Sequence, residues 1–216
     1  MNLSLEGKNA IICGSTRGIG HAIAEELALL GCKCTLLARN KELLQKVIKE
    51  LPASKGQSHD YLVADLSQPD GLKELIESHV QNEPVHILVN NTGGPPAGQI
   101  IEAEEEDFIK AFNQHLICNH ILTKAVVPSM KKEGYGRIIN IISTSVKIPI
   151  NNLGVSNTIR GAVASWAKTM SNELGSFNIT VNNLLPGNIT TQRLSSLIET
   201  NAKKGNATIE DVERRM

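Results

Sequence analysis

A loop with three glycines, set between two apolar segments, could bind a phosphate group. It reads Gly14-Ser15-Thr16-Arg17-Gly18-Ile19-Gly20, follows the apolar run 10–13 and precedes an amphipathic stretch, an order that predicts strand, tight turn and helix. Glycines let the backbone turn sharply, and the free N–H groups of a helix start attract a pyrophosphate. The loop therefore predicts a dinucleotide site, although its G-x-x-x-G-x-G spacing differs from G-x-G-x-x-G and such turns also occur without a ligand.

The residue after the second apolar run bears on which dinucleotide would bind. Proteins that bind NAD usually carry an acid there, which accepts hydrogen bonds from the ribose hydroxyls, but this run ends in Ala38 and is followed by Arg39. Arg39 and Arg17 could together bind a ribose 2′-phosphate, because guanidinium matches phosphate in shape and charge. We therefore expect NADPH rather than NADH. The alternative is that Arg39 only lies near a helix start and that Arg17 faces solvent.

Length and composition limit the class of protein. The chain has 216 residues with 22 basic and 22 acidic side chains, which fits one domain with a sizeable core. The basic residues are spread along the chain, which argues against a nucleic-acid partner and favours a small metabolite. Residues 1–8 lack the apolar core of a signal peptide, and no apolar run is long enough to span a membrane, so we expect a cytoplasmic protein.

The cysteines and acidic clusters give no indication of a metal site. Cys13, Cys32, Cys34 and Cys118 lie in apolar segments without a C-x-x-C pair, which suits reduced thiols that pack as small hydrophobic side chains. The acidic run 104–107 is typical of a solvated helix start. We expect no bound metal.

Short β-branched or leucine-rich runs alternate with helical patterns along the chain. This alternation predicts an α/β fold in which helices cover both faces of a doubly wound, mostly parallel sheet. Asn40 and Ser67 are predicted to cap the second and third helices. The expected strands are 9–13, 33–38, 60–64, 85–90, 137–142 and 179–184. The expected helices are 18–30, 41–50, 69–81, 104–113, 115–131 and 154–175.

Three further motifs stand at the ends of expected strands. Asp65-Leu66 ends the third strand, Asn90-Asn91-Thr92-Gly93 ends the fourth and Pro186-Gly187 follows the sixth. With the glycine loop, these motifs resemble the short-chain dehydrogenase/reductase family, especially reductases like 3-oxoacyl-carrier-protein reductase, over nearly the whole chain. The resemblance implies a Rossmann-like fold and an NADP(H) cofactor.

The resemblance also implies contacts to that cofactor. Asp65 would hydrogen-bond the adenine and Leu66 would contact it through its backbone, while Asn91 and Gly93 would line the adenosine ribose. Ile189 and Thr191 would contact the nicotinamide half. The expected cofactor-binding set is Gly14, Ser15, Thr16, Arg17, Gly18, Ile19, Gly20, Arg39, Asp65, Leu66, Asn91, Gly93, Arg160, Pro186, Gly187, Ile189 and Thr191.

The catalytic positions depart from the family pattern, which has an asparagine on the fourth helix, a serine after the fifth strand, and tyrosine and lysine in Y-x-x-x-K. Ser143 occupies the serine position, but the tyrosine position is Ser156 and the lysine position is Arg160. The asparagine position falls on His115. A serine hydroxyl is a far weaker acid than a phenol, and arginine stays charged at ordinary pH, so these residues are poor proton donors.

Other residues could take over the missing roles. His115 and Lys147 are possible proton donors, although a core histidine and a solvated loop lysine explain them as well. Asn113 or Asn119 could replace the family's asparagine if the helix is shifted. Loss of a general acid typically lowers a rate by roughly 10²–10⁴, which leaves a slow enzyme. The S-N-x-x-R pattern and the N-N-x-G-G-P-P loop are similar to a reductase-like branch of the family.

Two functions therefore fit the sequence. The leading one is an NADPH-dependent oxidoreductase that reduces a carbonyl substrate such as a 3-oxoacyl thioester, with Ser143 polarising the carbonyl. The alternative is an NADPH-binding protein without catalysis. The resemblance implies that helices 104–131 and 154–175 pair with a second copy in a homodimer or homotetramer. It also implies a single domain, 1–216, with 190–216 as a substrate lid and the family's seventh, C-terminal strand missing.

Overall fold

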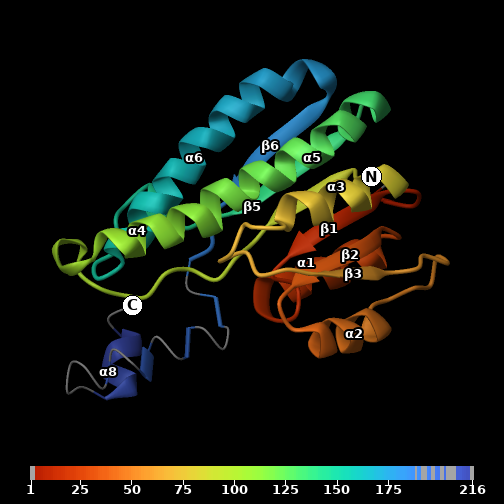
Figure 1. Ribbon diagram of the computed structural model, residues 1–216. Helices are drawn as coiled ribbons and strands as arrows, with labels where there is room; N and C mark the ends of the chain where they lie inside the picture. Colours follow the sequence, from red (N-terminus) through yellow and green to blue (C-terminus); the bar gives the residue numbers. More distant parts are fainter. Residues whose placement is uncertain are drawn as a thin grey trace. The chain divides into compact units, whose positions relative to one another are not determined.

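The chain divides into two compact units, Met1–Leu185 and Pro186–Met216. The computed structural model describes residues 3–187, 189–190, 194–195, 198–199, 202 and 208–214. The first unit holds the sheet and the helices that cover it (Figure 1). The second contains α8 (Ile209–Arg214) among its described residues. Within the described part of the chain, no helix combines the length and the apolar character needed to cross a membrane.

The sheet is parallel throughout and has the strand order β3-β2-β1-β4-β5-β6. Its strands are β1 (Asn9–Cys13), β2 (Lys33–Ala38), β3 (Asp60–Val63), β4 (Ile87–Asn90), β5 (Gly136–Ile141) and β6 (Ile179–Leu184). The chain moves outward in one direction from β1 to β3 and in the other from β4 to β6, so the predicted doubly wound fold is confirmed. Such sheets bind ligands beyond the carboxyl ends of the strands, where the order reverses, and here this point lies between β1 and β4.

Helices cover the two faces of the sheet because successive strand residues point to opposite sides. Ile11 packs with α3, α5 and α6 on one face, whereas Ile12 packs with α1 and α2 on the other, and both are completely buried. The helices are α1 (Gly18–Leu29), α2 (Lys41–Glu50), α3 (Leu72–Asn82), α4 (Glu105–Phe112), α5 (Cys118–Glu133) and α6 (Gly154–Leu174). Short turns are η1 (Ile100–Glu102), the π-helical η2 (Asn113–Ile117), η3 (Thr144–Val146) and η4 (Gly175–Phe177).

One of the two predicted helix caps is confirmed and one is wrong. The Asn40 side chain accepts the backbone N–H of Leu43 at 2.9 Å and caps α2. Ser67 does not cap α3, because its N–H and hydroxyl both bond to the carboxylate of Asp65. The chain then passes through Gly71, whose φ of 76° is left-handed, and α3 begins only at the next residue.

The acidic run 104–107 lies at the start of α4, as predicted: Glu104 is the N-cap residue, the other three form the first turn, and Glu104, Glu105 and Glu106 are exposed. The four cysteines are also as expected, since all are buried and free. Burial raises the pKa of the Cys13 thiol to about 12 and that of Cys118 to about 11. Thiols of this kind pack as small apolar groups and react poorly.

Three asparagine side chains join the carboxyl ends of β4, β5 and β6. Asn90 stands opposite Asn140 in the register, and Asn140 stands opposite Asn183. The Asn90 amide donates to Asn140 Oδ1 at 2.9 Å, and the Asn140 amide donates to Asn183 Oδ1 at 3.0 Å. Asn90 and Asn140 are buried. Buried amides are stable only with such partners, so this row holds the three strands in register beside the switch point.

We predict that Asn140→Ala lowers the free energy of unfolding by about 2–3 kcal/mol, because it deprives the neighbouring Asn90 and Asn183 side chains of their partners. Urea unfolding followed by circular dichroism measures this. Asn82→Ala is the control, since that exposed side chain only donates to the Ser78 carbonyl within α3. Equal losses in the two variants would contradict a structural role for the row.

Candidate functional site

The glycine loop connects β1 to α1 at the switch point and has no room for side chains at its ends. Gly14 and Gly18 both have a φ of 59°, in the left-handed region that favours glycine. A Cβ on Gly20 would lie 2.3 Å from the Gly14 carbonyl oxygen and 2.7 Å from the Asn91 side-chain nitrogen. The sharp turn predicted for the glycines is confirmed, and the close packing against Gly14 and Asn91 excludes a side chain at position 20.

The start of α1 has the features of an anion site. Arg17 is the N-cap residue, and the first turn contains no acidic side chain that would neutralise the positive end of the helix. Ser15 is completely buried, and its Oγ has no hydrogen-bond partner among the described residues. An unpaired buried hydroxyl in a loop of this shape fits a phosphate oxygen, which would supply the missing partner.

Asn91 fixes the loop from the neighbouring strand. It directly follows β4, and its amide donates to the carbonyl oxygens of Cys13 at 3.2 Å and Gly14 at 3.3 Å. The Gly14 N–H in turn donates to the Leu37 carbonyl of β2 at 2.8 Å. The turn is therefore held from both sides by the carboxyl ends of β4 and β2.

Arg39 and Asp65, which follow the adjacent strands β2 and β3, lie together in the structure. Arg39 Nη1 is 3.9 Å from Asp65 Oδ2, and the Arg39 side chain is 70 % exposed. An exposed pair at this distance contributes little to stability and is easily broken. Sequence reasoning gave the two residues separate ligand contacts and did not foresee that they pair.

Two other expected cofactor residues are attached to the helical layer. The Leu66 side chain is buried in the core, so only the backbone of this residue is left for a ligand. The Leu66 carbonyl oxygen accepts the Cys118 thiol at 3.2 Å. Gly93 is exposed, and its carbonyl accepts the side-chain amide of Gln114 at 2.9 Å.

Ser143 and Arg160 both reach the end of β5. Ser143 is half-buried, and its Oγ accepts the N–H of Ser145 at 3.0 Å, which orients the hydroxyl and leaves its hydrogen to donate elsewhere. Arg160 is buried in α6 and donates from Nη1 to the Ile141 carbonyl at 2.8 Å. Ser156 is half-buried in the first turn of α6, one turn before Arg160.

His115 is buried, with 1 % of its surface exposed, inside the π-helical turn η2. Its Nδ1 is joined to the Thr92 hydroxyl at 2.5 Å. The sequence analysis did not pair these two residues, which come from the segment after β4 and from η2. Asn119 is buried in α5, and Lys147 is exposed after η3, as the solvated-lysine alternative expects.

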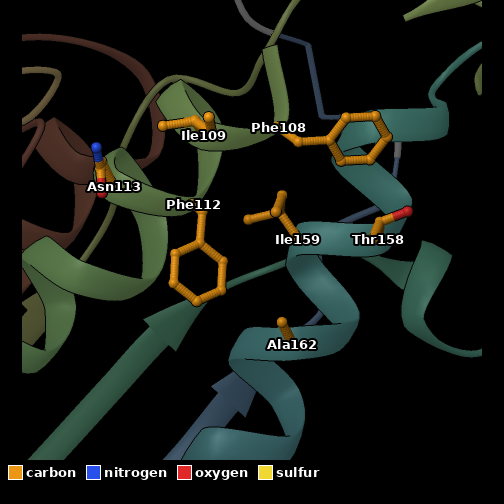
Figure 2. Close-up of a pocket in the computed structure, with 7 residues that line it drawn as sticks. All are labelled: Phe108, Ile109, Phe112, Asn113, Thr158, Ile159 and Ala162. Atoms are coloured by element: carbon orange, nitrogen blue, oxygen red, sulfur yellow. The ribbon is translucent and has the colours of Figure 1, made fainter. Parts of the chain in front are cut away.

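An apolar groove of about 360 Å³ lies between α4 and α6. In Figure 2, the rings of Phe108 and Phe112 stand on either side of Ile159. Phe112 is 39 % exposed and Ile109 is 59 % exposed. The residues that line the groove are Phe108, Ile109, Phe112, Asn113, Thr158, Ile159 and Ala162. Apart from Asn113, sequence reasoning named none of them individually.

The remaining expected contacts belong to the second unit. Pro186, Gly187 and Ile189 are described, and Ile189 is 48 % exposed. Thr191 lies outside the described residues, as do most residues of the expected lid. Their contacts with a cofactor stay predictions.

Comparison with known proteins identifies the family of this chain. The family model described as short chain dehydrogenase matches residues 8–202. The chain belongs to this family. The matched range includes the glycine loop, the asparagine motif after β4 and residues 143–160.

Relatives of this family member include named reductases. It is 33 % identical over 202 residues to 3-oxoacyl-(acyl-carrier-protein) reductase FabG of Pseudomonas aeruginosa, covering 91 % of this chain and 80 % of the relative. It is 34 % identical over 189 residues to dehydrogenase/reductase SDR family member 4 of Sus scrofa, covering 87 % and 67 %. Among solved structures, it is similar to L-sorbose reductase from Gluconobacter frateurii complexed with NADPH and L-sorbose, with a TM-score of 0.88, 29 % identity and coverage of 98 % and 81 %.

Proposed function

We propose that this short-chain dehydrogenase is an NADPH-dependent reductase of a small carbonyl compound, with a 3-oxoacyl thioester as one candidate substrate. The observation that carries the proposal is the exposed Arg39 guanidinium after β2, where an acid would select NADH. The relatives support it, because the L-sorbose reductase structure is an NADPH complex and FabG is named a 3-oxoacyl reductase.

The residues around the glycine loop fit the phosphates of this cofactor. The N–H groups at the start of α1 and the Ser15 hydroxyl would hold the pyrophosphate. Arg39, with Arg17, would hold the 2′-phosphate, a doubly charged group that competes easily with the exposed Asp65 carboxylate for the guanidinium. By family resemblance, Asp65 then turns to the adenine.

NADPH, when bound, would supply a hydride to the carbonyl carbon of the substrate, and the resulting negative charge on the carbonyl oxygen would need a hydrogen-bond donor and then a proton. Ser143 would donate a hydrogen bond to that oxygen, in the orientation set by the Ser145 N–H, and would keep its own proton. Arg160, fixed to the end of β5, supplies a permanent positive charge. Ser156 would pass a proton from water, which is slow because its hydroxyl is a weak acid. We propose that the buried His115 acts through Thr92 rather than on the substrate.

A second candidate function is an NADPH-binding protein without turnover. The presence of Ser156 and Arg160, in place of tyrosine and lysine, favours it, because neither side chain readily gives up a proton near neutral pH. The retained and oriented Ser143 favours the reductase. The four free, buried cysteines suit a reducing compartment, so we place either function in the cytoplasm. Residues 190–216 would form the substrate lid.

We further propose that the protein is a homodimer or homotetramer, paired through the face formed by α4 and α6. The groove between these helices is apolar, and Ile109 and Phe112 leave large parts of their side chains exposed at its walls. Burying these side chains against a second copy would remove them from water.

We predict that Arg39→Ala weakens NADPH binding by about 10–100-fold and leaves NADH binding within about twofold, because it removes charge-assisted bonds to the 2′-phosphate alone. Fluorescence titration with both nucleotides measures this. Lys41→Ala is the matched control, since this exposed lysine opens α2 two residues later. An equal loss for both nucleotides would contradict the assignment, and a wild-type protein that binds neither would remove both candidate functions.

We predict that Ser143→Ala lowers kcat by about 10²-fold, with NADPH affinity unchanged, because it removes the donor to the developing oxyanion. Carbonyl substrates, including a 3-oxoacyl thioester, are screened first by NADPH oxidation. Thr144→Ala serves as the control, because that side chain is exposed next to Ser143. If the wild-type protein binds NADPH but none of the screened substrates causes NADPH oxidation, the second candidate function is supported instead.

We predict that the wild-type protein sediments as a dimer or tetramer and that Phe112→Asp dissociates it, because a carboxylate cannot be buried in an apolar contact at low cost. Analytical ultracentrifugation gives the mass of both. Phe177→Asp is the control, since Phe177 is 41 % exposed on η4 and does not line the groove. A monomeric wild-type protein would overturn this assignment.

A further inference from the structure

The three residues that follow β4 are attached to two different parts of the protein. The Asn91 side chain donates to the carbonyl of Cys13, at the end of β1, and to that of Gly14, in the glycine loop. The next residue, Thr92, bonds to His115 Nδ1, and the Gly93 carbonyl accepts the Gln114 side chain. Residues 91–93 therefore bridge the glycine loop and the π-helical turn η2.

The η2 turn is an unusual support for such a bridge. It is π-helical from Asn113 to Ile117, between α4 and α5, and single π turns of this kind are rare and often occur at functional sites. It carries both residues that hold the bridge, and His115 is fixed by burial. A side chain that cannot move gives Thr92 one defined position.

The other end of the bridge has no freedom either. A Cβ on Gly14 would lie 2.7 Å from the Asn91 carbonyl oxygen, and one on Gly20 would lie 2.7 Å from the Asn91 amide nitrogen. The backbone and side chain of Asn91 thus fill the space against both ends of the glycine loop. Any displacement of Asn91 must change the shape of that loop.

We infer that Thr92 and His115 are positioning residues for the nucleotide site. Their bond holds residues 91–93 against η2 and so keeps Asn91 in the place that shapes the Gly14–Gly20 loop. This inference rests on the proposed nucleotide binding for its effect on affinity. It assigns His115 a role in binding the cofactor and none in proton transfer to the substrate.

Thr92→Val and Thr92→Ser test the inference, because valine matches threonine in shape without the hydroxyl and serine keeps the hydroxyl. We expect Thr92→Val to raise the NADPH Kd about tenfold and Thr92→Ser to keep it within about twofold. Thr169→Val is the matched control, since this exposed hydroxyl only donates to the Ser165 carbonyl within α6. In a His115→Phe background, Thr92→Val should add no further loss.

Hydrogen exchange of the ligand-free protein gives a readout that does not depend on nucleotide binding. Amides of residues 14–20 should exchange faster in Thr92→Val than in the wild-type protein, and Thr92→Ser should restore the slower rate. Unchanged exchange and unchanged Kd in Thr92→Val would overturn the inference, as would additive losses in the double variant. If the wild-type protein binds no NADPH, the proposed function fails and the exchange data alone decide on the positioning pair.

Discussion

The whole site depends on the close packing of the Gly14–Gly20 loop against Asn91, which leaves no room for a Cβ on Gly14 or Gly20. This contact lies at the point where the strand order reverses, so the carboxyl ends of β1 and β4 must be held at a fixed separation. The amide of Asn91 does this by bonding to two carbonyls of the opposite strand end. The start of α1, where we propose that the cofactor's pyrophosphate binds, depends on this packing for its shape.

The residues that we propose for catalysis also depend on a fixed strand end. Ser143 follows β5, and Arg160 crosses from α6 to bond the last residue of that strand. A buried arginine held in this way is a fixed charge rather than a proton carrier. In the function that we propose, Ser143 and Arg160 keep fixed positions at the end of β5, while Ser156 is a poor proton donor, so nucleotide binding and turnover can be tested separately.

The fold could be predicted because its signals are local. Continuous apolar runs located every strand, and the Asn40 cap followed from one side chain and the helix behind it. Ser67 was placed wrongly because Asp65 competes for the same hydrogen bonds, and such competition depends on which group is nearer in space.

The Thr92–His115 and Arg39–Asp65 contacts join residues 23 and 26 positions apart on different elements, so residue types alone do not disclose them. The sequence predicted that α4 and α6 meet a second copy. It could not predict which side chains line the groove, because the lining depends on the rotation of α4 against α6.

The asparagine row has a direction as well as a position. Each amide group gives its hydrogens to the oxygen of the next, from Asn90 through Asn140 to Asn183. The Asn90 oxygen, at the start of the row, has no hydrogen-bond partner among the described residues. Because every donor faces the same way, turning over one amide would set two nitrogens or two oxygens against each other, so the three can reverse only together. The orientation of the side chain on the edge strand β6 is therefore coupled to that of Asn90, the residue next to Asn91 in the chain.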